Sequence, residues 1–87
     1  MKRLICSIHD SKAEAWMTPL VFQAKGQAVR SFSDAVNRGD GDFYLHPEDF
    51  TLYVVGFFDE LSGAIEGCSA ELLGNGMNYK INGDVKE

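Results

Sequence analysis

The stretch TLYVVGFFD, residues 51–59, predicts the strand around which the fold is built. Alternate residues of an extended chain point to opposite sides, and both sides are apolar here. One side holds Leu52, Val54 and Phe58, and the other holds Tyr53, Val55 and Phe57. A strand of this kind is buried on both of its faces.

The residues on either side of this strand predict a turn before it and a hairpin after it. The sequence HPED, residues 46–49, has a proline followed by two acids, which suits the first positions of a short helical turn. Residues 59–63, DELSG, have the length and the final glycine of a hairpin loop. Residues 64–68, AIEGC, then form the returning strand, with Gly67 at a bulge.

The N-terminal residues 2–10 predict a second strand, because Leu4, Cys6 and Ile8 alternate and Asp10 stops the pattern. Residues 11–17 are polar and indicate a loop or a short helical turn. This segment contains Trp16, the only tryptophan of the chain.

A helix is predicted to end at Arg38-Gly39, and its start has two alternatives. Thr18-Pro19 could begin a long helix, or residues 20–22 form a short strand and the helix starts at Ala24 or Lys25. Gly26 favours the second, since a glycine inside a helix costs about 1 kcal/mol relative to alanine. The apolar stripe of this helix comprises Ala28, Val29, Phe32, Ala35 and Val36.

With 87 residues, the chain is expected to form one domain, in which residues 69–87 are a less certain C-terminal extension. That extension could add a weak strand over Met77–Ile81, after a turn at Asn75-Gly76. The expected fold class is α+β: a small, mostly antiparallel sheet of three to five strands with one main amphipathic helix on one face. The other face needs cover from residues 11–22, from the tail or from a partner subunit. For a short chain, dimerisation is the simplest way to cover this second face.

The net charge of −5 is unevenly distributed along the chain. Residues 1–38 hold six cations and three acids (+3), and residues 39–87 hold two cations and ten acids (−8). This asymmetry is compatible with a polyanion-facing side or with self-association of opposite patches. Overall acidity argues against strong non-specific binding of nucleic acid by a lone monomer.

Composition also bears on localisation and on the two cysteines. No apolar run approaches the roughly 20 residues of a membrane span, and the N-terminus does not resemble a signal peptide, so we expect a cytosolic protein. Cys6 and Cys68 lack metal-binding spacing. We interpret both as small buried apolar residues, and the cytosol argues against a disulfide.

The sequence contains no recognisable catalytic motif. GxSxG, HExxH, P-loop and GxGxxG patterns are all absent. His9 and His46 are the only histidines, and a small hydrolase or metal protein using His46 and Asp59 is the weakest hypothesis. We expect no enzyme activity, no cofactor and no metal.

Single-strand binding needs a cationic groove with aromatic side chains on which bases stack. The basic half of the chain interleaves such residues, and the candidates are Arg3, Lys12, Lys25, Arg30 and Arg38 with Trp16 and Phe22. Alternatively, the two aromatic residues belong to the core and the cations form a solvated face. Composition alone favours this alternative.

Three segments in order carry a resemblance to a known family: MKRLICSIHDSKAEAW at the N-terminus, PLVFQAKGQAVRSFSDAVN over residues 19–37, and HPEDFTLYVVGFFDELSG over residues 46–63. Together they resemble the small nonstructural protein of gokushoviruses, which are single-stranded DNA microviruses of bacteria. The likeness runs over residues 1–63 and rests on several pieces in register, since no single piece is a chemical motif.

The resemblance implies a DNA-binding accessory protein in the cytoplasm of the infected bacterium, without catalytic residues to carry over. We therefore expect binding of single-stranded DNA, in support of genome synthesis or of its hand-over to packaging, by a homodimer or higher oligomer. The alternative is an adaptor that recruits the viral replication initiator or a host replication factor without touching DNA. The residues expected to bind DNA are Arg3, Lys12, Trp16, Lys25, Arg30 and Arg38.

Overall fold

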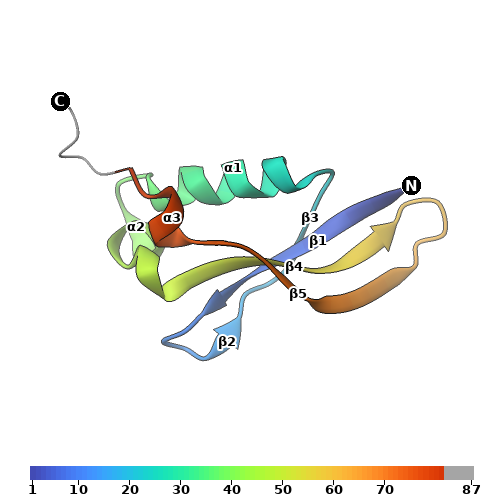
Figure 1. Ribbon diagram of the computed structural model, residues 1–87, viewed down its shortest axis with the longest axis horizontal. Helices are drawn as coiled ribbons and strands as arrows, with labels where there is room; N and C mark the ends of the chain where they lie inside the picture. Colours follow the sequence, from blue (N-terminus) through green and yellow to red (C-terminus); the bar gives the residue numbers. More distant parts are fainter. Residues whose placement is uncertain (82–87) are drawn as a thin grey trace.

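The computed structural model describes residues 1–81 and has the predicted α+β architecture, with a five-stranded antiparallel sheet and α1 across one face of it (Figure 1). Its elements are β1 (Lys2–Asp10), β2 (Ala15–Trp16), β3 (Leu20–Phe22), α1 (Lys25–Val36), α2 (Gly41–Leu45), the 3-10 turn η1 (Pro47–Asp49), β4 (Phe50–Asp59), β5 (Ile65–Asn75) and α3 (Gly76–Tyr79).

The two long central strands are β1 and β4, which pair from Lys2 opposite Asp59 to Asp10 opposite Phe50. The strand order is β2-β1-β4-β5, and β3 also pairs with β1. Because β2 and β3 pair with different parts of β1, the segment between β1 and α1 lines one edge of the sheet. The opposite edge is β5.

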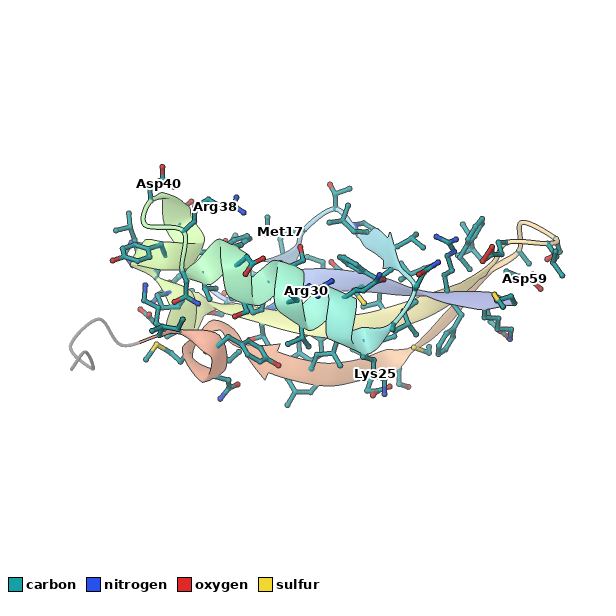
Figure 2. The ribbon with its side chains drawn as sticks, turned by 90° about the horizontal axis from the view of Figure 1, so that it is seen from above. Met17, Lys25, Arg30, Arg38, Asp40 and Asp59 are labelled. Carbon is teal, nitrogen blue, oxygen red and sulfur yellow. The ribbon has the colours of Figure 1, made fainter. Side chains whose placement is uncertain are left out.

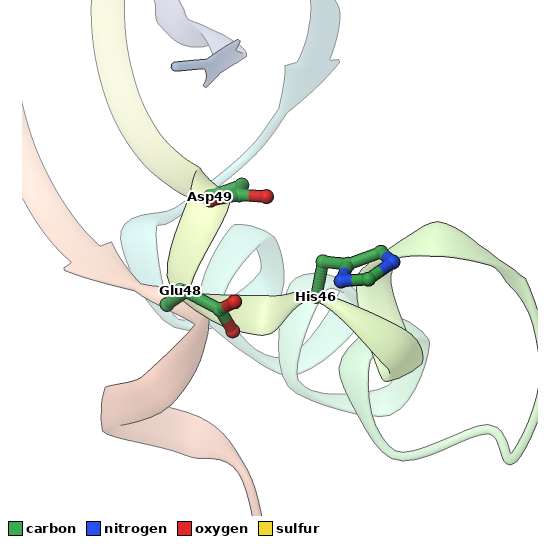
Figure 3. A group of neighbouring side chains, drawn as sticks. All are labelled: His46, Glu48 and Asp49. Carbon is green, nitrogen blue, oxygen red and sulfur yellow. The ribbon is translucent and has the colours of Figure 1, made fainter. Parts of the chain in front are cut away.

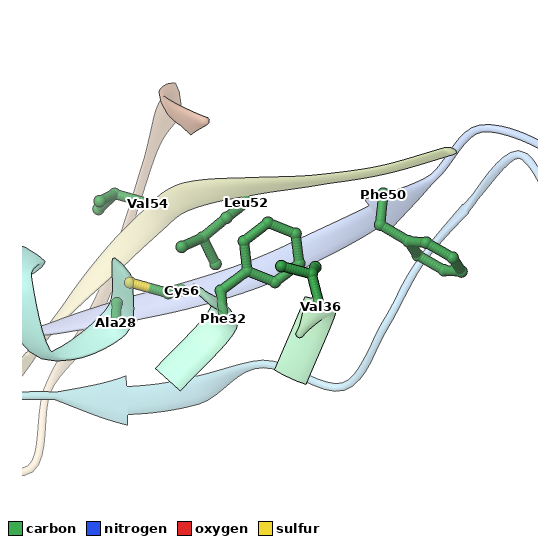
Figure 4. Packing of buried hydrophobic residues seen from close by; sticks show 7 residues of the cluster. All are labelled: Cys6, Ala28, Phe32, Val36, Phe50, Leu52 and Val54. Atoms are coloured by element: carbon green, nitrogen blue, oxygen red, sulfur yellow. The ribbon is translucent and has the colours of Figure 1, made fainter. Parts of the chain in front are cut away.

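The core lies between the sheet and α1 (Figure 4). Every fourth residue of α1 faces the sheet, as the apolar stripe predicted. The helix contributes Ala28, Phe32 and Val36; the sheet contributes Cys6, Phe50, Leu52 and Val54.

A bulge at Val55 changes which side of β4 each later residue faces. Cys6 lies opposite Val54 and Ile5 lies opposite Gly56, so Val55 has no partner in β1. Phe57 consequently packs against the core cluster. The simple alternation predicted from the sequence placed Phe57 on the side away from Val54, and it is wrong beyond the bulge because one inserted residue reverses the alternation.

Several sequence predictions are confirmed along the chain. Residues 2–10 form β1, and Pro47–Asp49 form the expected turn. The connection after β4 is held by Asp59, whose Oδ1 accepts hydrogen bonds from the amides of Leu61 (2.9 Å) and Ser62 (3.4 Å). The open choice at the start of the helix is also decided, because residues 20–22 form β3 and α1 begins at Lys25.

The C-terminal segment differs from its prediction. The returning strand β5 is longer than residues 64–68 and includes residues 69–75 of the segment that was expected to be an extension. The strand predicted at Met77–Ile81 is wrong, because α3 begins at Gly76. Asn75 caps this helix. Its side-chain oxygen accepts a hydrogen bond from the backbone amide of Met77 (2.9 Å), and its backbone amide donates one to the side-chain oxygen of Asn78 (2.7 Å).

Two further features were not predicted correctly. Residues 41–45 form α2, a short helix between the predicted helix and the HPED turn that the sequence patterns did not indicate. Cys6 is buried as expected, but Cys68 is exposed, and both thiols are free. The pairing of β5 with β4 jumps from Gly67 to Glu71, so Cys68 lies in an irregular part of the edge strand, where it need not be buried. Among the helices in residues 1–81, none is long and apolar enough to span a membrane.

Gly26→Ala is expected to raise the free energy of unfolding by about 0.5–1 kcal/mol. Gly26 is the second residue of α1, is exposed, and a Cβ added there meets nothing within 4 Å. Alanine therefore lowers the entropy of the unfolded chain without a clash. Urea denaturation followed by circular dichroism measures this change. A decrease in stability would contradict the unstrained helical geometry at this position.

Candidate nucleic-acid interface

The six residues predicted to bind DNA do not form one surface. Lys25 and Arg30 lie on α1, and Arg38 lies just beyond its C-terminal end (Figure 2). Trp16 lies on the sheet face opposite α1, where its ring contacts that of Tyr53 at 5.1 Å between centroids. A single DNA strand that contacted both Trp16 and the cations of the α1 side would have to cross an edge of the sheet.

Ion pairs within the chain neutralise several cations of the basic half. Lys2 pairs with Glu66 (3.2 Å), Arg3 Nε with Glu60 (2.9 Å) and Lys25 with Glu71. Arg3 also holds the pKa of Glu60 below its usual range, through a hydrogen bond and its charge. Three of the six cations of the basic half are therefore paired with acids of the acidic half, which reduces the charge asymmetry that the sequence indicated.

The remaining cations differ in their surroundings. Within residues 1–81, no ion pair involves Lys12, Arg30 or Arg38. Lys12 and Arg38 nevertheless line acidic hollows, both of which include Asp10 and Asp42. A polyanion approaching either hollow would meet more carboxylates than cations.

Arg30 lines a different kind of hollow, a shallow groove between β3 and α1 with a volume of about 490 Å³. We refer to it as the β3–α1 groove; Arg3, Val21, Phe22, Gln23, Gln27, Arg30, Ser31 and Asp34 line it. The lining comprises two guanidinium groups, two side-chain amides, a hydroxyl and one carboxylate; the Arg3 guanidinium is also paired with Glu60, so among the described residues of the groove Arg30 supplies the unpaired cation. Arginine and side-chain amides are among the usual donors to phosphate oxygens.

Local structure positions the polar side chains of this groove. The Gln27 side chain accepts a hydrogen bond from the Gln23 amide (2.9 Å), which joins the first turn of α1 to the end of β3. Arg30 is exposed, as expected from its place away from the apolar stripe. Of the six predicted residues, the groove therefore brings together Arg3 and Arg30. Gln23 and Ser31 were missed, because uncharged polar residues carry no distinctive signal in the sequence.

The turn before β4 places three potential metal ligands close together (Figure 3). The ligand atoms of His46, Glu48 and Asp49 all lie within 4.8 Å of one another, and they are the group in residues 1–81 that could hold a metal ion. His46 and Glu48 are exposed, and Lys12 lines the same hollow. The positive charge of Lys12 opposes a bound cation.

His46 and Asp59 cannot belong to one catalytic or metal site. They flank opposite ends of β4, whose ten residues extend about 30 Å at the usual rise of a strand. Asp59 has a structural role, since hydrogen bonds from the amides of Leu61 and Ser62 lower the pKa of its carboxyl group. The hypothesis that joined these two residues in one site is therefore wrong.

Comparison with known proteins assigns the family. Residues 3–79 match the family model described as Phage ORF5 protein. The chain belongs to this family. The Phage ORF5 match covers every helix and strand except the first residue of β1, and it extends through β5 and α3, beyond the residues 1–63 on which the gokushovirus resemblance rests. Neither a search of curated proteins nor a search of solved structures found a match. The protein is thus a bacteriophage protein that acts in the infected host.

Proposed function

We propose that this phage protein binds single-stranded DNA in the β3–α1 groove, with Arg30 as the principal phosphate contact. The observation that carries the proposal is the state of Arg30: it is exposed, forms no ion pair within residues 1–81, and shares the groove with Arg3 and two glutamine side chains. Phe22 is half-buried in the groove wall and offers limited stacking. Contacts of this kind read the backbone rather than the base sequence.

The proposed role follows from this chemistry together with the phage family. The protein would be a gokushovirus nonstructural protein that coats or guides single-stranded DNA during genome synthesis or during its hand-over to packaging, in the bacterial cytoplasm. It would act by binding and not by catalysis. The viral replication initiator is a candidate partner in this role.

Fluorescence anisotropy with a labelled oligonucleotide of about 16 nucleotides tests the proposal. We expect binding at about 50 mM salt that weakens steeply by about 200 mM, since released counterions drive it. Arg30→Glu should weaken binding roughly tenfold, which is about 1.4 kcal/mol, and should reduce the slope of log K against log salt by about 0.7 for each lost phosphate contact.

Arg38→Glu is the matched control, because it makes the same charge change at the C-terminal end of α1, in a hollow already lined by Asp10, Asp40 and Asp42. It should leave the affinity nearly unchanged. Lys25 is unsuitable for this comparison, since its reversal also breaks the ion pair with Glu71. Equal effects of the two arginine variants, or no binding at low salt, would contradict the proposal.

The acidic hollows around Lys12 and Arg38 favour one other function, an adaptor that binds a replication protein without touching DNA. If the protein is such an adaptor, wild-type protein and Arg30→Glu should both retain the purified viral replication initiator. Under this function, neither protein binds the oligonucleotide.

A further inference from the structure

The face of the sheet opposite α1, here called the open face, is apolar and largely uncovered. Figure 1 shows α1 along one side of the sheet, and within residues 1–81 no helix lies along the other side. Cross-strand partners point to the same side of a sheet. Residues paired on this side include Ile5 with Val21, Tyr53 with Leu72, Phe58 with Ile65, and His9 with Trp16.

One end of the open face is an aromatic cluster. The Trp16 ring lies 5.0 Å from that of His9 and 5.1 Å from that of Tyr53, both edge to face. Trp16 nevertheless keeps 49% of its surface exposed. Residues 11–22 therefore supply part of the cover that the second face of β4 was expected to need, and they supply it only at this end.

The rest of the open face is mostly aliphatic and at least as open to solvent as Trp16 along β5. Leu72 is 63% exposed, Ile65 is 73% exposed and Val21 is 48% exposed. Val21 lies on β3 and the other two lie on β5, so the apolar surface runs across the sheet from β3 to β5 and along it from Trp16 to Phe58. Contiguous apolar surface of this extent marks an interaction site on a soluble protein.

Charge indicates what kind of molecule covers this surface. Among the paired strand residues on the open face, Arg3 is the one charged side chain, and Glu60 already neutralises its charge. A nucleic acid needs free cations to neutralise its phosphates, and this face presents none in the described strands. Two copies of the face, by contrast, can meet without bringing like charges together, although the whole chain has a net charge of −5.

The outline of the molecule sets an upper limit on the area of the open face. The molecule measures 49 × 28 × 19 Å, and the view onto α1 in Figure 2 spans the longest and the shortest of these axes. The rectangle around the whole molecule in this view is 49 × 19, or about 930 Å², so the face can approach but not greatly exceed about 800 Å², the area that each partner buries in a standard interface.

We propose that the open face binds a second copy of this chain, so that two sheets pack face to face and the two α1 helices lie on the outside. The aligned packing of a β-sandwich brings such sheets about 10 Å apart. The interface is isologous, with the same residues contributed by both copies. The α1 wall of each β3–α1 groove, including Arg30, remains exposed in this dimer, whereas Arg3 and Val21 lie where the groove meets the open face. The dimer itself does not require DNA.

Light scattering coupled to size-exclusion chromatography tests the proposal on the full chain. We expect a mass of twice 9.6 kDa at tens of micromolar protein. Leu72→Glu should halve the measured mass, because it places a carboxylate within the apolar interface. The variant should still fold, since Leu72 is exposed on an edge strand; circular dichroism checks this.

Leu45→Glu is the matched control. Leu45 is 60% exposed and lies in α2, outside the sheet. This variant should remain dimeric. Trp16 provides a second readout: its emission should shift to shorter wavelength as wild-type protein is concentrated, and it should not shift in Leu72→Glu. A wild-type protein that stays monomeric at hundreds of micromolar, or a Leu45→Glu variant that dissociates equally, would overturn the proposal.

DNA binding separates this proposal from the proposed function. The monomeric Leu72→Glu variant should still bind a short oligonucleotide through Arg30, without a change in Trp16 emission. If the oligonucleotide instead quenches Trp16, the open face holds bases rather than a second copy, and the dimer proposal is wrong. If Leu72→Glu is monomeric and no variant binds DNA, the dimer proposal stands and the DNA proposal is wrong.

Discussion

Phe32→Ala is expected to lower the free energy of unfolding by about 3–5 kcal/mol, a large part of the 5–15 kcal/mol typical of a whole domain. Phe32 is 3% exposed and lies at the middle of the α1 stripe. Its ring contacts Phe43 of α2 at 5.8 Å and Tyr79 of α3 at 6.0 Å, both edge to face. One side chain therefore joins α1 to both short helices, as well as to the sheet. Urea denaturation followed by circular dichroism measures the loss.

Phe32→Leu and Leu61→Ala are the controls for this prediction. Leucine keeps most of the buried volume but removes both aromatic contacts. The free energy of unfolding of Phe32→Leu should therefore lie between those of wild type and Phe32→Ala. Leu61 is 86% exposed in the β4–β5 loop, and its truncation should change stability by less than about 0.5 kcal/mol. If Phe32→Ala costs no more than Leu61→Ala, the core assigned to α1 is wrong.

Much of the fold could be predicted because its signals are local. The apolar stripe of α1, the proline turn at Pro47 and the Asp59 loop each follow from residues close together in the sequence. The bulge at Val55 could not be predicted, because it depends on how β1 and β4 align over their whole length. α3 was missed for a different reason. An Asn-Gly pair is a strong hairpin signal, but here Asn75 caps a helix.

The candidate site could be predicted less well than the fold, because it depends on contacts between distant residues. Arg3 and Glu60 are 57 positions apart, and Lys25 and Glu71 are 46 positions apart. A count of charges along the chain cannot show that these groups neutralise each other. The periodicity of α1 did place Arg30 on the exposed side, and this residue keeps its charge available. The sequence identified candidate cations, and the structure shows which of them have partners.

Gly76→Ala is expected to destabilise the protein by about 1–3 kcal/mol or more, in the opposite direction to Gly26→Ala. Gly76 is buried at the start of α3, where the helix packs against η1. A Cβ added at Gly76 would collide with the carbonyl oxygen of Pro47 and lie 3.0 Å from Pro47 Cα. These are backbone atoms of a turn that also receives a hydrogen bond from Asn75, at the carbonyl of Glu48 (3.0 Å). Neither α3 nor the Pro47–Asp49 turn can move to relieve this clash without disturbing the other.

The comparison with Gly26→Ala isolates this steric effect, because the two variants make the same chemical change in two helices. Alanine reduces the entropy of the unfolded chain in both cases, so any difference in sign comes from the folded state. Denaturation of both variants under the same conditions gives the two free energies directly. If Gly76→Ala is as stable as wild type, α3 is not packed against Pro47 as described. If it unfolds more easily while Gly26→Ala gains stability, the contact between α3 and η1 is what requires glycine at position 76. The chain after β5 is then a packed part of the domain, held in place by the turn that leads into its central strand.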